Sequence, residues 1–122
     1  MRFPGWFAIL IGVAMLSQWS VSLATGGVPE LKSEPMRIGF HLAAELITAL
    51  LLIISGSGFL GSRRWGRPLL LVALGMLAYT STASPGYFAQ RGDMAYAAMF
   101  GAILSFTCAA IVSLFRGLID AE

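Results

Sequence analysis

The chain has 122 residues, of which 57% are hydrophobic and 11% are charged. Soluble domains carry roughly 25% charged residues, so this composition excludes an ordinary water-soluble domain, a disordered tail and a nucleic-acid-binding module. The net charge of +2 is too small to indicate a polyanionic partner. The single cysteine excludes an internal disulfide framework and a cysteine-rich metal site. These exclusions leave an integral membrane protein.

Four apolar segments are long enough to cross a hydrocarbon core as helices, which takes about 20 residues. They cover residues 3–25, 37–60, 68–84 and 93–115. Helices are required because lipid offers the backbone no hydrogen-bond partners. The four segments use most of the chain. The prediction is therefore an all-α fold, an integral membrane four-helix bundle with short loops, in which residues 1–122 form a single membrane domain.

Helix-breaking residues fall at the ends of these segments. Pro4 suits a first helical turn, and the glycines and proline within residues 26–29 end the first segment. Pro35 precedes the second segment, and the Pro-Gly pair at residues 85–86 predicts a turn that ends the third. Asp93 is the expected N-cap of the fourth, because its carboxylate suits the positive end of a helix.

The first segment allows a second interpretation. Arg2, an apolar stretch and the sequence Ser22-Leu23-Ala24 resemble a secretory signal that is cleaved after Ala24. The apolar run is long for a signal, and Gln18 and Trp19 interrupt its end. We therefore expect a retained membrane helix.

The distribution of basic residues predicts the orientation. Cytoplasmic loops of membrane proteins carry an excess of lysine and arginine. With the N-terminus inside, the basic residues on the cytoplasmic side are Arg2, Arg63, Arg64, Arg67 and Arg116, and those outside are Lys32, Arg37 and Arg91. The expected location is a cell or inner membrane with both termini cytoplasmic. The arginine-rich turn at residues 63–67 is interpreted as a topology signal, with a site for an anionic lipid or a partner as the alternative.

Helix association in lipid depends on small side chains at the contact. The fourth segment carries a small residue at every fourth position, and these form one shallow seam. The seam consists of Ala97, Gly101, Ser105, Ala109 and Ser113. We expect it to be the main helix–helix contact, made with a helix of this chain, a second copy or a protein partner.

The second segment carries polar residues inside the expected membrane. Arg37, His41, Glu45 and Thr48 fall within an arc of roughly 80° on a helix with 100° per residue. His41 and Glu45 are close enough to hydrogen-bond, because residues at i and i+4 are neighbours on a helix. An ionisable residue within a membrane helix is expensive and marks a candidate functional site.

Glu45 is expected to lie about 12 Å below the outer membrane surface, from the rise of the helix. Polar residues of other segments are expected at a similar depth in the membrane. Gln18 on the first segment and Tyr79 on the third are expected to join Glu45. The prediction is a polar cleft, open to the outside and floored by aliphatic packing, that serves a ligand or a proton. The alternative is that Glu45 is a buried hydrogen-bonding residue that fixes the helix register. One histidine and one glutamate supply only two metal ligands, so neither a metal nor a cofactor is expected.

Three classes of function remain. Because the sequence carries no catalytic motif, the first expectation is a non-enzymatic accessory or binding subunit of a membrane complex. The first alternative is a homo-oligomeric transporter or channel with Glu45 as its proton- or cation-linked group. Ala44-Glu45 followed by Thr48 is locally similar to the first-helix motif of small multidrug-resistance transporters, although Glu45 lies on the second segment here. The second alternative is a membrane enzyme acting on a lipid or quinone, with His41 as base and Glu45 orienting it.

Overall fold

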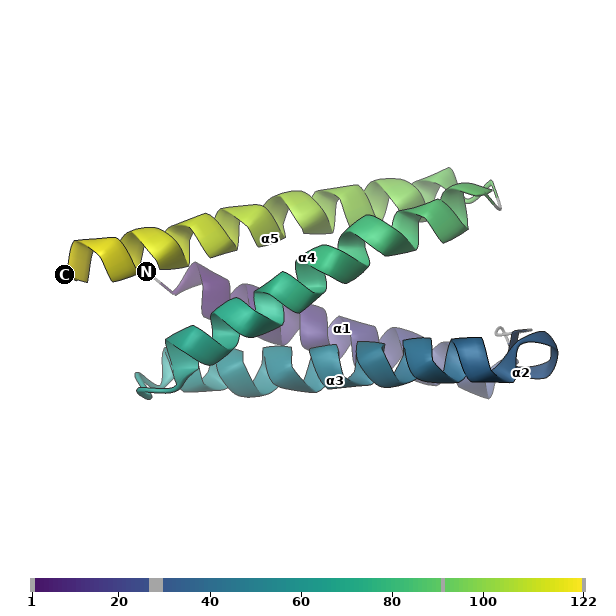
Figure 1. Ribbon diagram of the computed structural model, residues 1–122, viewed down its shortest axis with the longest axis horizontal. Helices are drawn as coiled ribbons and strands as arrows, with labels where there is room; N and C mark the ends of the chain where they lie inside the picture. Colours follow the sequence, from purple (N-terminus) through teal and green to yellow (C-terminus); the bar gives the residue numbers. More distant parts are fainter. Residues whose placement is uncertain (1, 27–29, 91, 122) are drawn as a thin grey trace.

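The protein is all-helical, as the sequence predicts (Figure 1). The computed structural model describes the backbone of residues 2–26, 30–90 and 92–121, and their side chains apart from those at 30–31, 84–88 and 118–121. The helices are α1 (Phe3–Ala24), α2 (Glu30–Ser33), α3 (Pro35–Leu60), α4 (Gly66–Gln90) and α5 (Met94–Ala121). Helix α2 is a single turn before α3. The four long helices alternate in direction along the chain, so the N- and C-termini lie at the same end (Figure 1).

The structure corrects the predicted end of the third segment. Helix α4 does not turn at Pro85 and Gly86 but continues to Gln90. Pro85 cannot donate a backbone bond to the carbonyl of Ser81, and a proline ring crowds that carbonyl. Membrane helices tolerate proline nevertheless, because neighbouring groups satisfy the freed backbone groups. The chain reverses instead around Gly92, whose φ of 84° suits a residue without a side chain.

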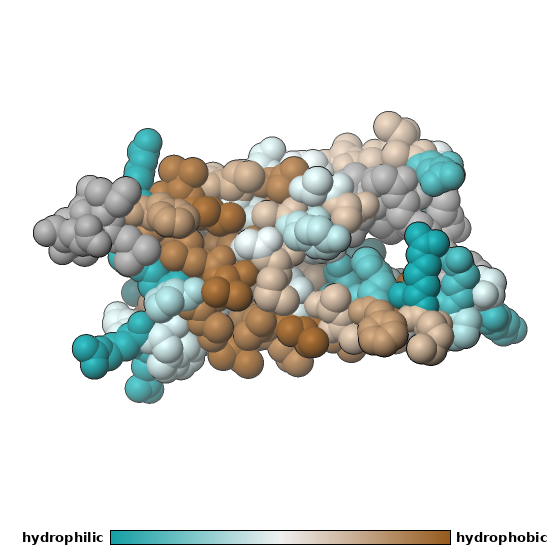
Figure 2. All heavy atoms as spheres, in the orientation of Figure 1, coloured by the Kyte–Doolittle hydropathy of each residue, from teal (hydrophilic) through white to brown (hydrophobic). Residues whose placement is uncertain are grey.

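Three helices are long and apolar enough to cross a membrane, namely α1, α3 and residues Met94–Gly117 of α5. Helix α4 is of similar length, but serines and threonines in its second half make it less apolar. Large apolar side chains are exposed on every long helix, including Leu10, Ile54, Val72 and Phe106. Figure 2 shows a brown apolar region, here called the apolar belt, over the left and middle part of the face in view, with hydrophilic residues toward both ends. This belt indicates a membrane protein, because water disfavours a continuous apolar surface of this kind.

Helices α1 and α3 pack closely because glycines let their backbones approach. A Cβ atom added to Gly56 of α3 would lie 2.8 Å from the carbonyl oxygen of Gly5. A Cβ atom added to Gly12 of α1 would likewise lie 2.8 Å from the carbonyl oxygen of Ala49. Small residues at such contacts are the usual basis of helix pairing in lipid.

The buried core lies in the half of the bundle near the termini. Helix α4 provides half of its buried apolar residues and packs between α3 and α5, while α1 and α5 touch only slightly. The buried apolar residues of this core are Ala8, Leu52, Leu70, Ala73, Leu74, Leu77, Ala110 and Leu114. Toward the other end the pair α1–α3 and the pair α4–α5 spread apart (Figure 1). The packing that holds the bundle together is therefore concentrated at one end.

The small-residue seam of α5 is not the face that this helix turns toward the buried core. Helix α5 faces the core with Thr107, Ala110 and Leu114, which are buried. The seam residues Gly101, Ser105 and Ala109 are exposed, while Ala97 and Ser113 are half-buried. A Cβ atom added to Gly101 would meet nothing within 4 Å. The face that packs is set by the apolar residues of α4, and contact of the seam with a partner or a second copy stays a prediction.

Candidate ligand groove between α3 and α4

The antiparallel arrangement of α3 and α4 brings Glu45 and Thr80 to one level. Glu45 lies ten residues after the start of α3, and Thr80 lies ten residues before the end of α4. At a rise of 1.5 Å per residue, both are about 15 Å from the same end of the helix pair. Glu45 is buried, with 8% of its surface exposed, and Thr80 has 9% exposed.

The Glu45 carboxylate accepts a short hydrogen bond at Oε1 from the Thr80 hydroxyl. The Nε2 atom of His41 lies 3.8 Å from the same oxygen, and His41 is one helical turn nearer the start of α3. Thr48 is also buried, but its hydroxyl donates to the carbonyl oxygen of Ala44 at 2.7 Å. The described hydrogen bond to Glu45 uses Oε1 only, so Oε2 is available to accept a hydrogen bond from a further group.

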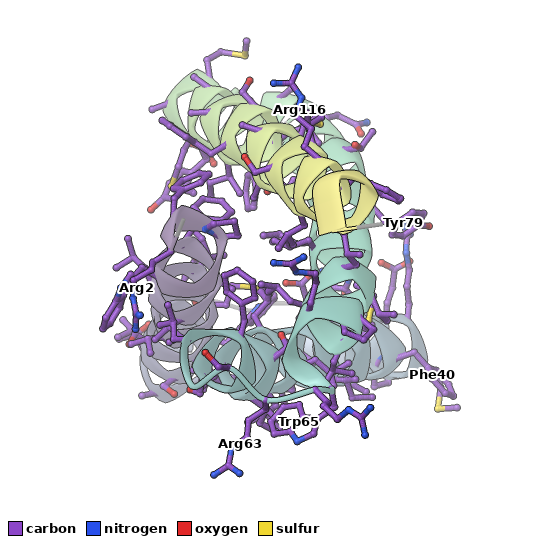
Figure 3. The ribbon with its side chains drawn as sticks, turned by 90° about the vertical axis from the view of Figure 1, so that its left-hand side faces the viewer. Arg2, Phe40, Arg63, Trp65, Tyr79 and Arg116 are labelled. Atoms are coloured by element: carbon purple, nitrogen blue, oxygen red, sulfur yellow. The ribbon has the colours of Figure 1, made fainter. Side chains whose placement is uncertain are left out.

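A groove of about 550 Å³ lies along these residues between the two helices. Its walls combine small and apolar side chains with the polar groups just described. The lining residues are His41, Ala44, Glu45, Thr48, Val72, Gly75, Met76, Tyr79, Thr80 and Ala83. Val72 is 56% exposed and Tyr79 is 78% exposed, and Figure 3 shows Tyr79 on the outer side of α4. The groove therefore opens sideways on the surface of the bundle.

The structure brings together four of the six residues predicted for the polar cleft. Glu45, His41, Thr48 and Tyr79 line the groove. Arg37 does not, because its side chain is 82% exposed and pairs with Glu34 at 3.5 Å.

Gln18 of α1 is exposed and is not among the residues that line the groove. Its neighbour Trp19 instead meets His41, with ring centroids 6.0 Å apart in an edge-to-face arrangement. The predicted cleft shared by all four segments is thus a groove of two helices, with Trp19 closing one side of His41.

Thr80 is the functional candidate that the sequence analysis did not select. It lies on the buried face of α4, three residues after Leu77 and seven after Ala73. Extending this helical periodicity would have favoured Thr80 over the adjacent Tyr79, which lies about 100° away around the helix. The partner of Thr80 on α3 is a tertiary contact that no pattern within one helix specifies.

The groove offers two groups with metal-binding chemistry, the Glu45 carboxylate and the His41 imidazole. In the described ranges no group of three or more histidine, cysteine, aspartate or glutamate side chains could hold a metal ion. The arrangement suits a hydrogen-bond-donating ligand instead, because carboxyl oxygens can accept hydrogen bonds.

A family model described as "Domain of unknown function (DUF8058)" matches residues 1–120. The chain therefore belongs to this family. A search of curated proteins and a search of solved structures each found no match.

Proposed function

We propose that this member of a family without a known function is a non-enzymatic binding subunit that spans the membrane four times. Its groove between α3 and α4 would hold an amphipathic molecule with a hydroxyl or amine head. The observation that carries the proposal is the buried Glu45 carboxylate, which lines a ligand-sized groove and whose Oε2 accepts no hydrogen bond from the residues that the structure describes. Ionisable residues inside membrane helices generally mark functional sites.

The four-span arrangement requires α4 to cross the membrane despite its polar second half. Its polar residues Thr80 and Ser81 are buried, with 9% and 0% of their surface exposed. The outward side of α4 carries Val72 and Tyr79, which suit lipid and the membrane interface. Packing against α3 and α5 therefore keeps the hydroxyl groups of Thr80 and Ser81 away from lipid. The excess of arginines at the end with both termini supports a cytoplasmic position for that end.

The size and chemistry of the groove favour a small amphipathic ligand. Ligand sites commonly have volumes of about 300–1,000 Å³, with apolar walls and a few polar groups that fix orientation. Here Ala44, Val72 and Met76 offer apolar contact to a hydrocarbon body. The carboxylate of Glu45 would accept a hydrogen bond from the head. The sideways opening allows entry from the lipid rather than from water.

The lining residues favour binding over catalysis. The Thr48 hydroxyl is engaged by its own helix and the Thr80 hydroxyl by Glu45. His41 approaches Glu45 only to 3.8 Å, and neither side chain has an activated nucleophile beside it. A binding role needs only the unused carboxylate oxygen and the apolar walls.

The test is to extract the protein gently from its own membrane and to identify the small molecules and proteins that accompany it. The proposal expects a defined amphipathic alcohol or amine with wild type and its loss with Glu45→Met. Glu34→Gln is the matched control, because Glu34 is an exposed acid just before α3. An identical small-molecule content in wild type and Glu45→Met would contradict a ligand role for the groove.

A homo-oligomeric transporter is the second candidate, favoured by the same buried carboxylate. The core argues against a path through one chain, because Leu52, Leu70 and Leu74 are fully buried beyond the groove. A transport path would then need a second copy. A strictly monomeric protein, or unchanged transport with Glu45→Gln, would exclude this candidate.

A further inference from the structure

A second cavity lies at the end of the bundle that carries both termini, away from the α3–α4 groove. Its volume is about 400 Å³, and its lining residues are Arg2, Phe59, Leu60, Ser62, Arg63 and Arg67. Half of this lining is arginine. Among the side chains that the structure describes, no carboxylate lines the cavity. Figure 3 looks onto this end and shows Arg2 beside α1 and Arg63 extending away from the bundle.

Two of the three guanidinium groups are positioned by neutral partners. Arg2 donates from Nη2 to the carbonyl oxygen of Leu60, at 3.3 Å, where α3 ends. The guanidinium carbon of Arg67 lies 5.7 Å from the centre of the Phe59 ring. A Cβ atom added to Gly117 of α5 would lie 3.2 Å from Nη1 of Arg67, so this glycine leaves room for the guanidinium.

The Leu60 carbonyl group and the Phe59 ring carry no net charge, so they hold Arg2 and Arg67 in place without cancelling their positive charges. Three like charges around one cavity repel each other unless an anion joins them. Guanidinium groups match phosphate oxygens in geometry and form charge-assisted hydrogen bonds with them. The arrangement therefore has the chemistry of a phosphate site.

We propose that this arginine pocket binds the phosphate group of an anionic phospholipid. Its lining residues lie where α1 and α4 begin and where α3 ends, which is the level expected for lipid headgroups. Phe59 and Leu60 give the same cavity an apolar wall that can receive the start of an acyl chain. Basic pockets between membrane helices on the cytoplasmic side commonly bind anionic headgroups. The proposal is independent of any ligand in the α3–α4 groove.

The experiment compares Arg63→Gln with Arg64→Gln in the purified full-length chain. The two residues are adjacent, exposed and equal in charge, but only Arg63 lines the cavity. Native mass spectrometry would measure binding of phosphatidylglycerol and of phosphatidylcholine to each protein. We expect wild type and Arg64→Gln to prefer phosphatidylglycerol, and Arg63→Gln to bind it about tenfold more weakly. Arg67→Lys, which keeps the charge but loses the planar fork, should weaken binding as well.

Equal weakening by Arg63→Gln and Arg64→Gln would overturn the proposal, because it would show only a general attraction to negative charge. Unchanged binding in both variants would overturn it too. Inorganic phosphate provides the second arm of the test. Binding of phosphate ion without a preference for phosphatidylglycerol would assign the pocket to a free anion and refute the lipid.

Discussion

Thr80→Val removes the hydroxyl that donates to Glu45 while keeping the shape of the side chain. A hydrogen bond to a charged group contributes about 1.5–3 kcal/mol in water-soluble proteins, and side-chain hydrogen bonds within membranes contribute about 0.6 and at most about 1.7 kcal/mol. Glu45 is only 8% exposed, so water cannot replace the lost donor. We expect the free energy of unfolding to fall by about 1–2 kcal/mol.

Thr82→Val is the matched control on the same helix. Its hydroxyl is exposed and donates to the carbonyl of Ala78 at 2.8 Å, so its loss should change stability by no more than about 0.5 kcal/mol. The measurement is reversible unfolding of the full-length chain in mild detergent micelles, followed by circular dichroism.

The double variant Thr80→Val with Glu45→Met sharpens this prediction. Replacing both partners by apolar groups of similar shape leaves no stranded carboxylate and can be nearly neutral. The double variant should therefore recover most of the stability that Thr80→Val loses. Strict additivity of the two changes, or equal effects of Thr80→Val and Thr82→Val, would refute the assigned hydrogen bond.

Two further predictions concern packing and membrane position. Gly56→Ala and Gly66→Ala should each lower stability by about 1–3 kcal/mol, because the new Cβ atoms would lie 2.8 Å from the Gly5 carbonyl oxygen and 2.5 Å from the backbone nitrogen of Phe59. Gly101→Ala, in open space, should stabilise the helix slightly in the same unfolding assay, and equal effects of all three would contradict the packing. Cys108 is exposed in the middle of α5, so a charged maleimide should label it after detergent denaturation but not in intact membrane vesicles. Rapid labelling in intact vesicles would place this part of α5 in water.

The sequence was sufficient for the helices because length and apolar composition are local properties. Three helices have the length and hydropathy of membrane spans, and the i, i+4 spacing of His41 and Glu45 gives their proximity on α3. The predicted end of α4 was wrong, because a single proline does not necessarily end a helix in a membrane protein. The helix loses a single hydrogen bond at Pro85 and continues.

Contacts between helices were harder to predict, because they depend on rotation about each helix axis. Gln18 and Tyr79 were expected beside Glu45 by depth. Tyr79 does line the groove, but the groups that contact His41 and Glu45 directly are Trp19 and Thr80. Adjacent residues of a helix point about 100° apart, so an expected depth alone does not select the residue that faces another helix. The α5 seam illustrates the same point, since a regular row of small residues does not say which face packs.

Filling the groove between α3 and α4 with a larger side chain tests most directly whether this groove holds an amphipathic ligand. Gly75 lines the groove, and a Cβ atom added there meets nothing within 4 Å, so Gly75→Leu occupies the space without a clash at its base. Gly101→Leu adds the same side chain to open space outside the groove. The measurement is the amount of amphipathic ligand that remains with each purified protein. The account predicts ligand with wild type and Gly101→Leu and its loss with Gly75→Leu at unchanged stability. Full ligand occupancy in a folded Gly75→Leu protein would contradict it.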